Sequence, residues 1–180
     1  MLKGKDIVHF LSIHDVRFYC GVPDSVLKEF CMSLSSQSSS RHIITANEGG
    51  AIALAAGYYL ASGKIPLVYM QNAGLGNAVN PLTSLANKEV YRIPMILLIG
   101  WRGEPHFAKA PRGEPGQNDE PQHRKEGEVT LPLLKLLDMP HVVLSDVPPI
   151  AEKQIAVAVK TAKRRSTPYA LLVRKGTFEL

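Results

Sequence analysis

The sequence has few of the features that mark membrane, secreted or metal-binding proteins. Its longest apolar runs are far too short to span a bilayer, and no signal peptide precedes the predicted fold. Its two cysteines, Cys20 and Cys31, have neither metal-ligand spacing nor the pattern of a secreted disulfide scaffold. We therefore expect buried thiols and a cytoplasmic protein.

Features of nucleic-acid-binding proteins are missing as well. The chain has 21 Lys and Arg residues against 16 Asp and Glu residues, a formal net charge of +5, but no basic face is interleaved with aromatic side chains. Nucleic acid is therefore a poor hypothesis for a partner. A mild positive balance suits a small anionic substrate instead.

The chain does have enough apolar residues for a real core. With 45 % hydrophobic residues in 180, we expect residues 1–180 to form one domain. We predict strands at Arg17–Cys20, His42–Thr45, Pro66–Met70, Pro94–Ile99, Val142–Leu144 and Tyr169–Val173. We predict helices at Lys5–Ile13, Ser25–Leu34, Gly49–Ala61, Asn80–Asn87, Val129–Leu137 and, capped by Asp146, from Pro148 to Arg164. This alternation predicts an α/β fold with a doubly wound, mainly parallel six-stranded sheet and helices on both faces.

One acidic residue occupies a prominent place in this pattern. Glu48 lies where a short apolar strand gives way to a small-residue helix, and two glycines follow it. Sheets of this kind bind ligands beyond the carboxyl ends of their strands, and the glycines permit close approach of a ligand or a second chain. The alternative is a solvated acid in the first turn of a helix. Trp101 to Glu126 has no apolar period, and we expect it to form a long loop that overhangs the same edge.

Four segments together resemble the phosphonopyruvate and sulfopyruvate decarboxylases, which use thiamine diphosphate. The segments are Gly21-Val-Pro-Asp-Ser25, Asn47-Glu-Gly-Gly-Ala-Ile-Ala-Leu-Ala-Ala-Gly57, Tyr69-Met-Gln-Asn-Ala-Gly-Leu-Gly-Asn-Ala-Val-Asn-Pro81, and Gly100-Trp-Arg-Gly-Glu-Pro105 with Asp119-Glu-Pro-Gln-His123. The resemblance extends through Leu171-Leu-Val-Arg-Lys-Gly-Thr177 and is strongest to the phosphonopyruvate members. It covers only the pyrimidine-binding domain of that family.

The resemblance implies a partner. In the family, a second domain holds the diphosphate and Mg²⁺ through a Gly-Asp-Gly motif, which this sequence does not contain. The chain is therefore expected to act as an α subunit that joins a complementary diphosphate-binding (β) subunit or domain in a homo- or hetero-oligomer. The helix Ala51–Leu60, rich in Ala and Gly, suits close packing across that interface.

The resemblance also implies roles for individual residues. Glu48 matches the glutamate that hydrogen-bonds the aminopyrimidine of the cofactor and favours its imino tautomer, a form of acid–base catalysis. His123 and Asp24 are candidate acid–base groups in decarboxylation of a 2-oxo acid. On the cofactor side we place Gln71, Asn72 and Gly74 beside Glu48, and on the substrate side Asp24, Ser25, Arg102, Arg112 and His123.

Simpler roles remain open for several of these residues. Asp24 and Ser25 could each cap a helix, and Gln71 and Asn72 could brace a loop. Asn77 and Asn80 could be a turn residue and a helix cap. Arg102 and Arg112 both stand in an Arg-Gly-Glu-Pro sequence, and either could pair with a phosphonate or sulfonate.

Two departures from the family pattern are visible. An extra segment, His106–Pro115, repeats Arg-Gly-Glu-Pro, and Ala73 replaces an expected serine. The alternative function is a non-catalytic, orphan or regulatory protein that retains this domain. A nucleotide-dependent oxidoreductase fits poorly, because Gly74-Leu-Gly-Asn-Ala-Val79 lacks the third glycine of the dinucleotide fingerprint.

Overall fold

The computed structural model describes residues 1–35, 37–105 and 120–178. Its strands are β1 (Tyr19–Gly21), β2 (His42–Ile44), β3 (Leu67–Gln71), β4 (Ile96–Trp101), β5 (His141–Val143) and β6 (Tyr169–Arg174). Its helices are α1 (Gly4–Ile13), α2 (Lys28–Ser33), α3 (Glu48–Ser62), the 3₁₀ turn η1 (Asn72–Gly74), α4 (Leu75–Ser84), α5 (Pro121–Leu136) and α6 (Pro148–Arg165). No helix in these ranges is both long and apolar enough to cross a bilayer.

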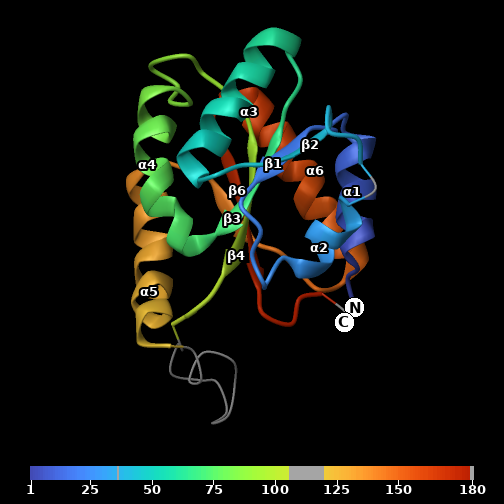
Figure 1. Ribbon diagram of the computed structural model, residues 1–180, viewed down its shortest axis with the longest axis vertical. Helices are drawn as coiled ribbons and strands as arrows, with labels where there is room; N and C mark the ends of the chain where they lie inside the picture. Colours follow the sequence, from blue (N-terminus) through green and yellow to red (C-terminus); the bar gives the residue numbers. More distant parts are fainter. Residues whose placement is uncertain (36, 106–119, 179–180) are drawn as a thin grey trace.

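The strands of the described residues form one parallel sheet in the order β2-β1-β3-β4-β6-β5. The helices α1, α2 and α6 cover one face, and α3, α4 and α5 cover the other (Figure 1). This arrangement confirms the predicted doubly wound α/β fold. The central strands are buried on both faces, which explains why β4 is a continuous apolar run without alternation.

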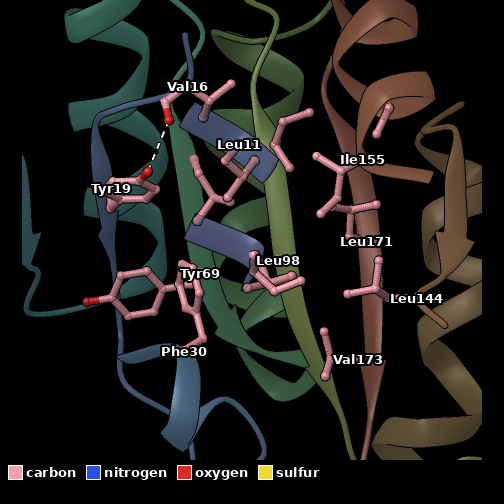
Figure 2. Packing of buried hydrophobic residues seen from close by; sticks show 14 of the residues in the cluster. Leu11, Val16, Tyr19, Phe30, Tyr69, Leu98, Leu144, Ile155, Leu171 and Val173 are labelled. Carbon is pink, nitrogen blue, oxygen red and sulfur yellow. Dashed lines mark hydrogen bonds between the residues drawn. The ribbon is translucent and has the colours of Figure 1, made fainter. Parts of the chain in front are cut away.

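Side chains that alternate along the strands build two separate cores. Tyr69, Leu98 and Leu171 point to the face covered by α1, α2 and α6, where they meet Phe30 and Ile155 (Figure 2). Met70, Ile99 and Leu172, each one residue further along, pack under α3, α4 and α5. Both cysteines are free thiols, with Cys20 buried in the second core and Cys31 partly buried against the first.

Helix α4 corrects the prediction of a helix over Asn80–Asn87. It begins at Leu75, directly after η1, and ends at Ser84, so the predicted start is five residues too late. Leu75, Ala78 and Leu82 are buried at helical spacing, and that packing outweighs the weak helix propensity of the neighbouring residues. Pro81 lies inside the helix and cannot donate to the carbonyl of Asn77.

Helix α5 corrects the prediction of a helix beginning at Val129. It starts at Pro121, whose fixed φ suits the first helical position, and the polar residues that follow are exposed on its outer side. His123, predicted on a loop, therefore lies in the first turn of a helix. Residues 106–119, which contain Arg112 and most of the repeated segment, lie outside the described residues.

The predicted start of α2 and the predicted cap of α6 are also wrong, although α6 begins at Pro148 as predicted. Helix α2 begins at Lys28, because a turn closed by Leu27 N–H to the Asp24 carbonyl (3.2 Å) precedes it. Helix α6 has Val147 at its N-cap, and Ser145 Oγ accepts the Val147 N–H at 3.2 Å, so Asp146 makes no cap bond.

Candidate functional site

The structure brings most of the candidate residues to one edge of the sheet. Asp24 follows β1, Glu48 follows β2, Gln71 ends β3 and Arg102 follows β4, and these parallel strands end side by side. The helix after β1 covers one face of the sheet, whereas the helices after β2 and β3 cover the other. This divergence creates the crevice in which such folds bind ligands.

Glu48 is positioned by the start of α3. The N-cap Asn47 accepts the Gly50 N–H at 2.7 Å, which fixes the first turn and places Glu48 at its beginning. The positive end of the helix dipole favours a carboxylate there. The side chain is half-buried, so one part of it remains accessible.

Gly74 leaves the space that the Glu48 carboxyl group occupies. A Cβ atom on Gly74 would lie 2.5 Å from both Cδ and Oε1 of Glu48, well inside van der Waals contact. The other carboxylate oxygen, Oε2, accepts a hydrogen bond of 3.0 Å from Nδ2 of Asn77 on α4. The carboxylate is therefore held between η1 and α4, two elements that follow β3.

Gln71 and His123 meet at the same edge from distant parts of the chain. Nδ1 of His123 lies 3.3 Å from Nε2 of Gln71 and 3.0 Å from Oε2 of Glu126. The shorter contact, to a carboxylate, requires a hydrogen on Nδ1, which leaves Nε2 as the basic nitrogen of the neutral ring. With the Gln71 amide turned to present its oxygen, both neighbours accept from Nδ1.

Close backbone packing fixes the distance between α5 and the end of β4. Gly103, at φ +66°, and Gly127 lie so close to the opposing backbone that a Cβ on either would overlap it. The carbonyl of Gly127 also accepts the Trp101 indole N–H at 3.4 Å. These contacts join the end of β4 to the first half of α5, and so place His123 beside Gln71.

Asn72 also stabilises the contact between the end of β4 and α5. Its Nδ2 donates to the Arg102 carbonyl and to Thr130 Oγ1, both at 3.0 Å, and its Oδ1 accepts the Arg102 N–H at 3.2 Å. The side chain is only 4 % exposed. These bonds match the loop-bracing alternative, and direct contact of Asn72 with the cofactor remains a prediction.

Asp24 lies against the end of β4. Its Oδ2 accepts the Val26 N–H at 2.9 Å, and a Cβ on Gly100 would collide with the same oxygen. Burial raises the pKa of Asp24 above its ordinary value of 3.8, while these backbone bonds and the Arg102 guanidinium oppose that rise. The raised pKa makes Asp24 easier to protonate than an exposed aspartate, which is a property of groups that donate protons in active sites.

The remaining substrate-side candidates differ in their surroundings. Arg102 is half-buried at the end of β4, near Asp24, whereas Ser25 is exposed on the turn before α2. Arg112 lies outside the described residues. Within those residues, Arg174 of β6 forms a bidentate ion pair with Glu104, which ties the Arg-Gly-Glu-Pro segment to the sheet.

Sequence reasoning missed two contributors to this site. Glu126 had no motif to mark it, although its i,i+3 spacing from His123 would have been informative had the helix been predicted to start at Pro121. Asn77 was considered only as a turn residue or cap, because the contact with Glu48 spans 29 residues of sequence.

Comparisons with known proteins show the family to which the chain is related. The family described as "Thiamine pyrophosphate enzyme, N-terminal TPP binding domain" matches residues 1–124. A phosphonopyruvate decarboxylase of Streptomyces hygroscopicus is 35 % identical over 176 residues, which is 98 % of this chain and 41 % of that protein. The α subunit of sulfopyruvate decarboxylase from Methanocaldococcus jannaschii is 34 % identical over 98 residues, 54 % of this chain and 56 % of that subunit. The chain thus spans about two fifths of the length of the phosphonopyruvate decarboxylases that it matches.

A solved structure supports the fold. The thiamine diphosphate-dependent 4-hydroxybenzoylformate decarboxylase of Rhodococcus jostii RHA1 superposes with a TM-score of 0.68 at 22 % identity, over 97 % of this chain and 30 % of that one. At this identity the likeness concerns the fold alone. With the matched profile covering more than half of the sequence, the chain belongs to the thiamine pyrophosphate enzyme family, through its N-terminal TPP-binding domain.

Proposed function

We propose that this chain is the pyrimidine-binding subunit or domain of a thiamine-diphosphate-dependent decarboxylase. Its substrate is phosphonopyruvate or sulfopyruvate, and the products are CO₂ and the corresponding aldehyde. The observation that carries the proposal is the Glu48 carboxylate, held at the carboxyl edge of the sheet in space that Gly74 leaves open. The relatives with these substrates in their names supply the reaction class.

The residues present fit the aminopyrimidine half of the cofactor. The Glu48 carboxyl group occupies the space that the missing Cβ of Gly74 leaves, and a half-buried carboxylate there can exchange a proton with a ring nitrogen. Gln71, at the end of β3, offers an amide for orienting a polar ring. When bound, thiamine diphosphate supplies a thiazolium ring that serves as the electron sink for loss of CO₂.

His123 and Asp24 are the groups that this chain offers for the later proton transfers. His123 presents Nε2 as its basic nitrogen because Glu126 accepts from Nδ1. Asp24 is pushed towards its protonated form by burial, so it can donate a proton to the departing product. Their positions after β1 and on α5 place them on the same edge as Glu48.

Arg102 is the candidate for the terminal anion of the substrate. Its backbone is fixed by both bonds to Asn72, so its side chain starts from a defined point near Asp24. A guanidinium can pair with a phosphonate or a sulfonate through two parallel hydrogen bonds. Arg112 remains a second candidate.

Activity requires a diphosphate-binding partner that holds Mg²⁺. The chain contains no Gly-Asp-Gly, and several relatives are α subunits by name. The outward side of α3 has an uninterrupted stripe of apolar or small exposed residues that suits the interface with such a partner, namely Gly50, Ala53, Gly57 and Leu60.

The test is decarboxylation of phosphonopyruvate and of sulfopyruvate with thiamine diphosphate and Mg²⁺. The chain is assayed alone and with a candidate diphosphate-domain subunit, with Glu48→Gln as the inactivating change and Glu152→Gln, on the exposed side of α6, as the matched control. Activity only in the mixture, lost in Glu48→Gln and kept in Glu152→Gln, would support the proposal. A mixture that forms a complex but releases no CO₂ from either substrate would reject it and favour a non-catalytic protein.

A further inference from the structure

Asn77 is the one side chain with a recorded hydrogen bond to the Glu48 carboxylate in the described part of the chain. It projects from the first turn of α4, and its Nδ2 lies 3.0 Å from Oε2 of Glu48. Both groups are at least partly open to solvent, so the bond is not needed to satisfy a buried polar atom.

Close backbone contacts around this hydrogen bond fix the positions of Glu48 and Asn77 relative to each other. A Cβ on Gly49, the neighbour of Glu48, would lie 3.0 Å from the Asn77 carbonyl oxygen, so the first turns of α3 and α4 are in near contact. Gly74 closes the other side of the carboxyl group. One carboxylate oxygen thus accepts from an amide and the other faces the side of Gly74 where a Cβ would lie, which restricts rotation of the carboxyl plane.

An amide suits a carboxyl group that gains and loses a proton. While Glu48 is ionised, the Asn77 nitrogen donates to it, and once Glu48 carries the proton, the amide can turn over and accept through Oδ1. A lysine or arginine would instead hold the carboxylate in its charged form, and an aspartate would repel it. Asn77 can therefore orient Glu48 in both states without favouring one strongly.

We propose that Asn77 is a positioning residue that holds the Glu48 carboxylate in the orientation required for proton exchange with the cofactor. This inference rests on the proposed function, because Glu48 is taken as the proton-relay group. It adds a residue that touches neither substrate nor the reacting atoms and acts through Glu48 alone. Asn80, on the same helix, provides the matched control, since it is exposed and no side-chain hydrogen bond is recorded for it in the described residues.

The first arm of the test uses the full chain without cofactor. Side-chain amide resonances of Asn77 and Asn80 are recorded by nuclear magnetic resonance in the unchanged chain and in Glu48→Ala. We expect the Asn77 amide to shift and its hydrogens to exchange faster in the variant, with Asn80 unaffected. Identical Asn77 signals in both proteins would overturn the proposal, whether or not the complex is an enzyme.

The second arm uses the complex with the diphosphate-binding subunit. Asn77→Ala is expected to lower kcat roughly 10-fold with an unchanged KM for the 2-oxo acid, as loss of one oriented hydrogen bond implies, whereas Asn80→Ala leaves both constants unchanged. On the residual single-turnover rate of the Glu48→Gln complex, Asn77→Ala should have little further effect, because both changes act through one group. Equal losses in both backgrounds would refute the positioning role. If the unchanged complex is inactive, the proposed function fails while the first arm still decides whether Asn77 orients Glu48.

Discussion

Gly74→Ala should impair the function of the site while it leaves the stability of the domain almost unchanged. The backbone of Gly74 has φ −67° and ψ −14°, values that alanine adopts readily, so the change adds no backbone strain. The new Cβ would lie 2.5 Å from Cδ and Oε1 of Glu48, against an ordinary contact of at least 3.4 Å. The carboxyl group must therefore retreat by about 1 Å, and its half-exposed position allows it to do so.

The opposing energies of this change nearly cancel. Loss of the Asn77 hydrogen bond lowers the free energy of unfolding by about 0.5–1.5 kcal/mol. Replacing glycine by alanine at a helical position raises it by about 0.4–1 kcal/mol, because alanine lowers the conformational entropy of the unfolded state. The free energy of unfolding should change by less than about 1 kcal/mol. A displacement of about 1 Å in a catalytic group, however, can reduce the rate about 100-fold.

The assay compares Gly74→Ala with Gly76→Ala. Gly76 lies two residues further along, and a Cβ there would meet nothing within 4 Å. Gly76→Ala should therefore keep full activity in the complex and raise the free energy of unfolding by about 0.5–1 kcal/mol, measured by urea denaturation. A folded Gly74→Ala complex that decarboxylates at the normal rate would refute the reasoning, as would equal losses in both variants.

Three further changes test other parts of the site. Asn72→Ala should lower the free energy of unfolding by about 2–3 kcal/mol in urea denaturation, because it removes three hydrogen bonds that the buried Asn72 side chain makes to Arg102 and Thr130; a loss below about 1 kcal/mol would contradict the bracing role. Asp24→Asn should raise Tm at neutral pH. Burial raises the folded-state pKa of Asp24 above its ordinary value of 3.8, so ionisation of Asp24 lowers the free energy of unfolding as pH rises from 3.8 through the folded-state pKa. The gain in Tm from Asp24→Asn should therefore shrink as pH falls towards 3.8. A gain that does not depend on pH would count against this reasoning. Glu126→Gln should reduce kcat on the order of 10-fold, because the carboxylate no longer fixes the proton on Nδ1 of His123, whereas Glu128→Gln on the same helix should have no effect; equal rates in the two variants would remove Glu126 from the site.

The strands were the most predictable part of the fold because their signal is local. Central parallel strands are buried on both faces, so β4 and β6 are marked by continuous apolar runs, whereas the apolar run in α3 consists mostly of alanine. The helices were harder, since the start of α6 was correct but its cap was not, and α2 began three residues later than predicted. Caps depend on which of several nearby oxygens faces the first turn, and composition does not specify that.

The errors in α4 and α5 fall on the site itself. By their propensities Gly76, Asn77 and Pro121 are typical of loops, yet they lie in or at the start of helices that tertiary packing stabilises. Those same first turns supply Asn77 beside Glu48 and His123 beside Gln71. A site that needs close backbone approach and polar groups at helix starts must use residues with weak helix propensity, so local rules fail where the function lies. Glu48 and Gly74 could be identified from sequence because each lies in a contiguous segment that resembles a known motif, whereas Asn77 becomes recognisable only in the fold, where α4 lies beside the start of α3.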